Sequence, residues 1–93
     1  MFAFEYYPTG DYINVYFDMK NYYFDYNELI NNFGVVKKGG CDKILNKMKD
    51  IRFLKIHQAI VLLDCFLRTE NVQAYILYYV YPMLVKYKKS LII

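Results

Sequence analysis

The residue types that most often carry out catalysis are few and far apart in this 93-residue chain. His57 is the only histidine and Ser90 the only serine. Cys65 is the cysteine nearest to His57, but eight residues of helix would separate the two by about 12 Å, too far for a nucleophile and its base. Two cysteines and one histidine at wide spacing also match no zinc-binding pattern. We therefore expect a protein that is not an enzyme and has no catalytic residue, metal site or cofactor.

Four carboxylates in the N-terminal third have structural explanations. Asp25 and Glu28 have the spacing of a capping box at a helix start, and Asp11 and Asp18 lie in segments that favour turns. A hydrolase or nuclease site would require the fold to bring several of these carboxylates into one cleft.

The basic residues lie mainly in the middle and at the end of the chain. Residues 1–36 hold one lysine and five carboxylates, a net charge of −4, whereas residues 37–93 hold eleven Lys and Arg and four carboxylates, a net charge of +7. Seven cations fall within nineteen residues: Lys37, Lys38, Lys43, Lys47, Lys49, Arg52 and Lys55. Such a segment predicts contacts with nucleic-acid phosphates, because released counterions provide sequence-independent affinity. The same charges would also fit an ordinary solvated face.

The Lys37-Lys38-Gly39-Gly40 loop precedes the second expected helix, for which Asp42 is the expected cap. It has neither the Walker spacing nor the dinucleotide-binding spacing. Its backbone N–H groups and two lysines could hold one phosphate, although Asp42 would oppose an anion there.

The elements that must position these residues divide into strands and then helices. Residues 2–7 and 12–17 are rich in aromatic and β-branched residues and flank a Pro-Thr-Gly-Asp turn, which predicts a hairpin. A second turn at 18–21 precedes a short third strand at 22–24.

The rest of the chain predicts about four helices, which makes the fold class α+β. We expect them over about 26–33, 43–50, 57–68 and from 70 towards 81, with a short strand possible within 52–56. Gly34 should end the first helix, Thr69 should cap the fourth, and Pro82 should kink or end it before a helical pattern resumes at 83–90. Asp64 and Arg68 have the spacing of a helical ion pair.

Length and composition predict one intracellular domain over residues 1–93. The N-terminus has no basic region ahead of an apolar core, and the longest apolar run, 74–85, is too short to span a bilayer, so neither a signal peptide nor a membrane partner is expected. Cysteines without a short-spaced partner favour a reducing compartment.

Three segments of the chain resemble a known family. The stretch YFDYNELINNFGV at 23–35 resembles the Bro-N domain, the N-terminal domain of baculovirus repeated-ORF proteins that also occurs in phage antirepressors. Leu67-Arg68-Thr69 with the later Ala74, and VYPMLVK at 80–86, are similar to the following parts of that domain. The similarity covers roughly residues 12–89. The sequence departs from the family pattern in three places: Pro82 comes about five residues early relative to Ala74, Val35 replaces an aromatic residue, and the loop at 38–40 is longer.

The resemblance implies a small viral or phage-type DNA-binding domain that regulates transcription or replication, in the host cytoplasm or nucleus. It identifies no residue that reads bases. The partner it implies, duplex DNA, fits the seven cations named above.

The aromatic content supports a different class of function. Tyr75, Tyr78, Tyr79 and Tyr81 would point to several sides of the helix after Gln73, so some must be exposed or paired. Tyrosine is enriched at protein interfaces. The alternative is therefore a non-catalytic interaction module or inhibitor that binds another protein or forms a homodimer.

Overall fold

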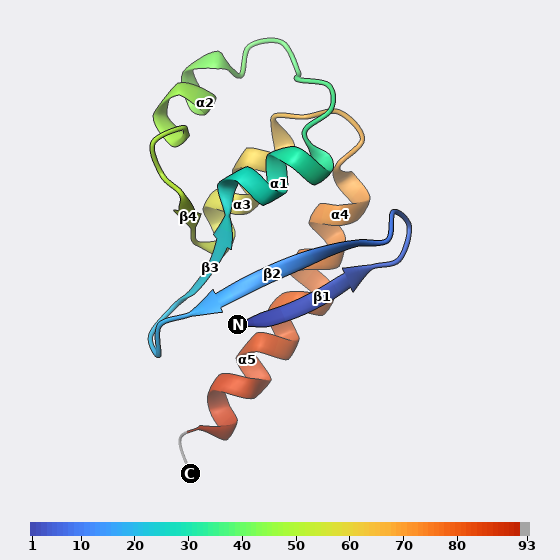
Figure 1. Cartoon of the computed structure of the whole chain (residues 1–93). Coiled ribbons are helices and arrows are strands. Elements are labelled where there is room, and N and C mark those ends of the chain that lie inside the picture. The colour runs from blue at the N-terminus through green and yellow to red at the C-terminus, as the bar shows by residue number, and fades with distance from the viewer. Residues whose placement is uncertain (92–93) are drawn as a thin grey trace.

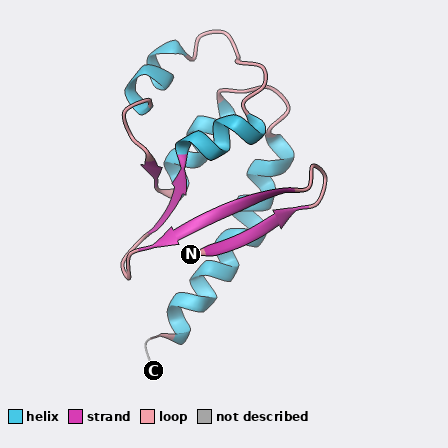
Figure 2. Cartoon of the chain, in the orientation of Figure 1, coloured by secondary structure: helices cyan, strands magenta, loops and turns pink. Residues whose placement is uncertain are grey.

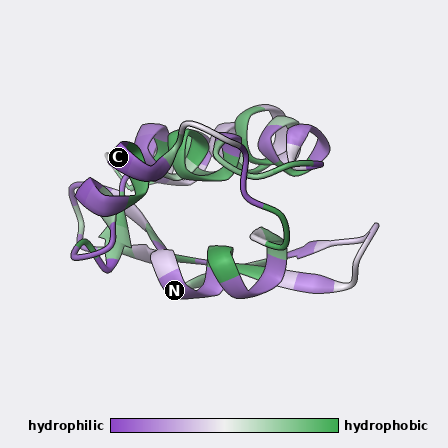
Figure 3. Cartoon of the chain, turned by 90° about the horizontal axis from the view of Figure 1, so that it is seen from above, coloured by the Kyte–Doolittle hydropathy of each residue, from purple (hydrophilic) through white to green (hydrophobic). Residues whose placement is uncertain are grey.

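A four-stranded antiparallel sheet crosses in front of a long helical column in the computed structural model, which describes residues 1–91 (Figure 1). The strands are β1 (Phe2–Tyr6), β2 (Asp11–Phe17), β3 (Tyr22–Asp25) and β4 (Phe53–Leu54), in that order across the sheet. The predicted hairpin, third strand and short strand within 52–56 are confirmed. Seen from above, the sheet with α1 (Tyr26–Phe33) forms one layer and the other helices form a second (Figure 3).

One face of the sheet supplies half of the core because apolar residues alternate along the strands. Val15 stands opposite Phe2 on β1 and Phe24 on β3, and Phe24 stands opposite Leu54 on β4. Val15, Phe24 and Leu54 are fully buried, and Ile13 is buried two residues before Val15. The α+β fold class predicted from the sequence is confirmed.

Helix α1 begins and ends as predicted. Asp25 caps it by accepting hydrogen bonds from the backbone N–H groups of Asn27 and Glu28. The predicted return contact of a capping box is wrong, because the Glu28 carboxylate instead accepts from the backbone N (2.8 Å) and Nδ2 (2.6 Å) of Asn14. Glu28 thereby joins α1 directly to β2. Gly34 ends the helix, where a Cβ atom would lie 2.9 Å from the carbonyl oxygen of Ile30.

The central helix is α3 (Ile56–Asp64), which contacts α1, α2 (Asp42–Met48), α4 (Glu70–Tyr75), β3 and β4. It stops four residues earlier than predicted, and the chain turns with Arg68 at a positive φ of 62°. The predicted ion pair between Asp64 and Arg68 is wrong, because the two residues no longer share a helix. Helix α2 includes Asp42, and Cys41 takes the cap position that we expected Asp42 to take.

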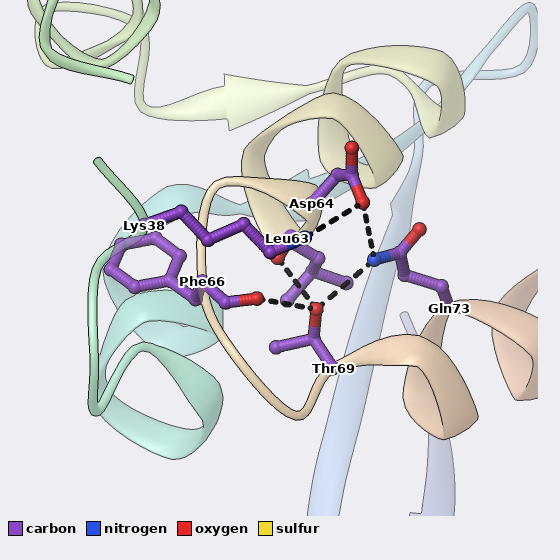
Figure 4. Close-up of polar contacts among 6 residues, drawn as sticks. All are labelled: Lys38, Leu63, Asp64, Phe66, Thr69 and Gln73. Atoms are coloured by element: carbon purple, nitrogen blue, oxygen red, sulfur yellow. Dashed lines mark hydrogen bonds and ion pairs between the residues drawn. The ribbon is translucent and has the colours of Figure 1, made fainter. Parts of the chain in front are cut away.

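Thr69 explains why α3 ends early. Its side chain is buried, and its hydroxyl lies 2.6 Å from the carbonyl oxygen of Leu63 and 3.1 Å from that of Phe66 (Figure 4). The hydroxyl oxygen also accepts from Nε2 of Gln73 at 3.0 Å. Thr69 precedes α4 as predicted, but its hydroxyl bonds to the end of α3 and not to the first N–H groups of α4, so the capping contact we expected is wrong.

The C-terminal helical column has no loop between its parts. Helix α4 runs into a π-helical segment, η1 (Ile76–Val80), and then into α5 (Tyr81–Ser90) (Figure 2). The N–H of Tyr81 donates to the carbonyl of Ile76, five residues earlier. Pro82 has no N–H to donate to a helical bond, and the wider turn directly before it lets the helix continue. The kink or end that we expected at Pro82 is therefore wrong. Within residues 1–91, no helix is long and apolar enough to cross a membrane.

Candidate nucleic-acid interface

The seven cations predicted to contact phosphates do not form one continuous surface. Three of them lie next to carboxylates: Lys37 Nζ is 2.7 Å from Asp42, Lys38 Nζ is 3.5 Å from Asp64, and Arg52 Nε is 3.7 Å from Asp25. The hydrogen bond that Lys37 donates to the carboxylate of Asp42 raises the pKa of Lys37. The guanidinium of Arg52 also lies over the ring of Phe53, 5.1 Å from its centroid. These three cations are therefore partly neutralised within the protein.

Three other cations belong to α2 or follow it directly. Lys43, Lys47 and Lys49 are exposed and form no ion pair among the described residues. Lys43 and Lys47 lie one helical turn apart on the same side of α2, and we name these two the α2 basic face. No residue of α2 is fully buried, although Leu45 and Met48 pack against the core. Helix α2 therefore contributes little to the core and presents three free cations to solvent.

Lys55, the seventh cation, lines a groove with lysines from other parts of the chain. The groove has a volume of about 450 Å³ and lies between the β2–β3 turn, the start of α3 and the end of α5. Lys20, Lys88 and Lys89 complete its basic lining. We name this hollow, with its four lysines, the lysine groove. Sequence reasoning missed it, because only the pairing of β4 with β3 places Lys55 beside the turn that holds Lys20.

Two hydrogen bonds hold the walls of the lysine groove together. Lys88 Nζ donates to the carbonyl oxygen of Lys20 at 2.7 Å, and the hydroxyl of Tyr22 donates to the carbonyl of Leu84 at 2.8 Å. Phe24 and Leu84 also line the groove and are buried, so its floor is apolar. His57, in the first turn of α3, also lines the groove.

Three of the four N-terminal carboxylates accept structural hydrogen bonds. Asp18 accepts from the backbone N of Lys20 and Asn21, which lowers the pKa of its carboxyl. Asp25 and Glu28 hold α1 as described, and Asp11 lies at the opposite end of β2 from Asp18. Within residues 1–91, no three His, Cys, Asp or Glu side chains are placed to hold a metal ion.

A second surface gathers exposed tyrosines around a hollow of about 460 Å³ beside the hairpin turn. Tyr7 is 81% exposed and Tyr78 is 80% exposed, whereas Tyr75 is half-buried, donates to the carbonyl of Glu5 at 2.8 Å and stacks on Tyr79 at 5.1 Å. We name these four tyrosines the tyrosine surface. The prediction that some tyrosines of this helix are exposed or paired is confirmed.

Comparison with known proteins identifies no related protein. No protein-family model matches the chain, and no significant match was found among curated proteins or solved structures. The resemblance to the Bro-N domain therefore stays a prediction from the sequence.

Proposed function

We propose that this protein binds nucleic acid, with duplex DNA as the favoured partner, as a small regulatory domain of viral or phage type. The observation that carries the proposal is the α2 basic face. Lys43 and Lys47 are one helical turn apart and form no ion pair within residues 1–91, on a helix that contributes little to the core. These two lysines take no part in the core, and an ordinary solvated face would carry them without a function. Contact with phosphates gives them a function, because a lysine that neutralises a phosphate releases a counterion from the DNA.

The contacts in this proposal are to the backbone of the DNA and not to its bases. Lysine binds phosphate as a point charge, and contacts of this kind position a protein without reading sequence. The Bro-N resemblance supports a regulatory setting, and the paired cations Lys37, Lys38 and Arg52 have a smaller role than the sequence suggested.

Fluorescence anisotropy with a labelled duplex of about 20 base pairs tests the proposal, with salt varied from about 50 to 200 mM. Lys43→Gln with Lys47→Gln should weaken binding and lower the slope of log K against log salt by up to about 1.8, since each lost phosphate contact accounts for about 0.9. The control pair, Lys20→Gln with Lys89→Gln, removes the same charge elsewhere and should keep the slope. Absence of duplex binding at low salt, or an equal loss in the control pair, would contradict the proposal.

The tyrosine surface favours a second candidate function, assembly with a second copy of the chain. Exposed tyrosines supply contact area at a low cost in side-chain entropy and are frequent among the residues that dominate binding energy. Tyr7 and Tyr78, which are the most exposed of the twelve tyrosines, both line the hollow.

Analytical ultracentrifugation over a range of protein concentrations tests this second candidate. We expect the unmodified chain to dimerise, and Tyr7→Ser with Tyr78→Ser to raise the dissociation constant at least tenfold, because each residue contributes about 1 kcal/mol or more at such an interface. Val35→Ser changes a side chain of similar exposure, 81%, at another place and should have no effect. A monomer at every concentration would exclude the homodimer.

A further inference from the structure

We propose that the lysine groove is a binding site for a phosphorylated small molecule of the nucleotide type. The site lies at the β2–β3 turn and the end of α5 and includes none of Lys43, Lys47 and Lys49. It therefore goes beyond the proposed function and does not depend on it.

The charge of the groove is the first argument. Lys20, Lys55, Lys88 and Lys89 come from three separate segments, yet they line one hollow to which no Asp or Glu side chain of residues 1–91 contributes. The nearest acidic residue in the β2–β3 turn, Asp18, is engaged by backbone N–H groups and by the hydroxyl of Tyr23. Cations gathered in a concave site without a counter-charge repel one another and concentrate anions there. A bound anion would remove that repulsion.

The start of α3 is the second argument. Lys55 occupies the cap position with φ −69° and ψ 165°, the extended backbone that capping residues adopt. A lysine side chain has no acceptor, and its charge lies at the positive end of the helix dipole, where a carboxylate or hydroxyl is preferred. No acidic residue follows in the first turn. Since Lys55, Ile56 and His57 all line the groove, an anion in it would supply the missing acceptor.

The shape of the groove indicates the rest of the ligand. Its volume of about 450 Å³ exceeds what a phosphate alone needs and is within the range of small-molecule sites. Phe24 and Leu84 make an apolar floor, and Tyr81, which is 44% exposed, offers a ring on one wall. An aromatic base could stack on Tyr81 while phosphates contact the lysines.

The site is also held in place before a ligand arrives. The bonds from Lys88 to Lys20 and from Tyr22 to Leu84 tie α5 to the β2–β3 turn across the groove. A preformed site loses little entropy on binding. Lys20 and Lys89 form no side-chain ion pair among the described residues, so they can be replaced without disturbing these bonds.

The experiment uses the whole chain and ATP that carries a fluorophore on its ribose. Binding is followed by anisotropy, and unlabelled ATP, inorganic tripolyphosphate, adenosine and a short single-stranded oligonucleotide are the competitors. We expect ATP to displace the probe, tripolyphosphate to do so at higher concentration, and adenosine to require at least a hundredfold more. Lys20→Gln with Lys89→Gln should weaken ATP binding at least tenfold, whereas Lys43→Gln with Lys47→Gln should leave it within twofold.

Two controls separate a loss of charge from a loss of folding. Lys20→Arg with Lys89→Arg should restore binding, and the melting temperature should show that both variants fold. No binding of the probe, or an equal loss in the α2 pair, would overturn the proposal. Displacement by the oligonucleotide at lower concentration than ATP would overturn the assignment to a small molecule. The variant that serves as the test in the ATP assay is the control in the duplex titration, and the reverse. The two proposals can therefore be contradicted independently.

Discussion

The thiols of Cys41 and Cys65 lie together at the edge of the core. Cys65 is 1% exposed, and its burial, with a hydrogen bond to Cys41, raises the pKa of its thiol to about 11 from an ordinary value of 9.0. The neutral thiol is therefore strongly favoured in the folded protein. Both thiols are free, and the backbone N–H of Lys38 donates to the Cys65 carbonyl at 2.8 Å.

The raised pKa of Cys65 predicts a loss of stability in alkaline solution. Below pH 9 the thiol is protonated in the folded and the unfolded state, so its titration does not change the free energy of unfolding. As the pH rises from about 9 to 11, only the thiol of the unfolded chain ionises. This ionisation stabilises the unfolded state, so the free energy of unfolding falls. Urea unfolding across this range should show a smaller decrease for Cys65→Ala than for the unmodified chain, since tyrosine and lysine titrations are common to both. Parallel decreases in the two proteins would show that Cys65 has no such role.

At the scale of elements, the start of α3 departs most clearly from the rules for helix stability. The other well-formed helix start, that of α1, has Asp25 as its cap, whereas α3 has Lys55. Gln58 accepts from the backbone N–H of Lys55 at 2.9 Å, but the first N–H groups of α3 receive no side-chain cap. Departures of this kind often mark functional positions, where stability is lower than the sequence could provide.

Lys55→Asp should therefore raise stability and remove a function. An aspartate at this backbone conformation can cap α3 and suits its dipole, so we expect the free energy of unfolding to rise by about 0.5–2 kcal/mol, measured by urea denaturation. ATP binding should fall at least tenfold. Lys55→Ala removes the charge without adding a cap, and it should weaken ATP binding with little gain in stability. A Lys55→Asp variant that is less stable than the unmodified chain would contradict this account.

The elements that sequence reasoning predicted well have local signals. Asp25 and Gly34, the residues directly before and after α1, start and end the helix as expected. The end of α3 could not be predicted, because it depends on Thr69 reaching back to the carbonyls of Leu63 and Phe66. Apolar residues continue past Asp64, and nothing in their spacing indicates that the helix has stopped.

At the scale of the whole molecule, the candidate sites depend on contacts between distant segments. The molecule measures 47 × 28 × 17 Å, and the helical column spans much of its length (Figure 1). The basic segment 37–55 looks continuous in the sequence, but the fold pairs Lys37, Lys38 and Arg52 with carboxylates and moves Lys55 to a different surface from α2. Periodicity predicts which side of an element is polar; it does not predict which elements become neighbours.

The π-helical segment determines where the end of the chain points. The buried residues of the column, Val72, Ile76, Val80 and Leu84, are four positions apart. A regular α-helix turns by about 100° per residue, so this spacing would drift by about 40° at each step and carry Leu84 away from the sheet. The additional residue in η1 cancels most of that drift. If this segment became an ordinary α-helix with the same number of residues, Leu84, Lys88 and Lys89 would rotate by about 100° from their partners, whereas deletion of one residue from it would restore an ordinary helix and keep them in place. The lysine groove therefore depends on the wide helical turn of a segment that contributes no charge to it.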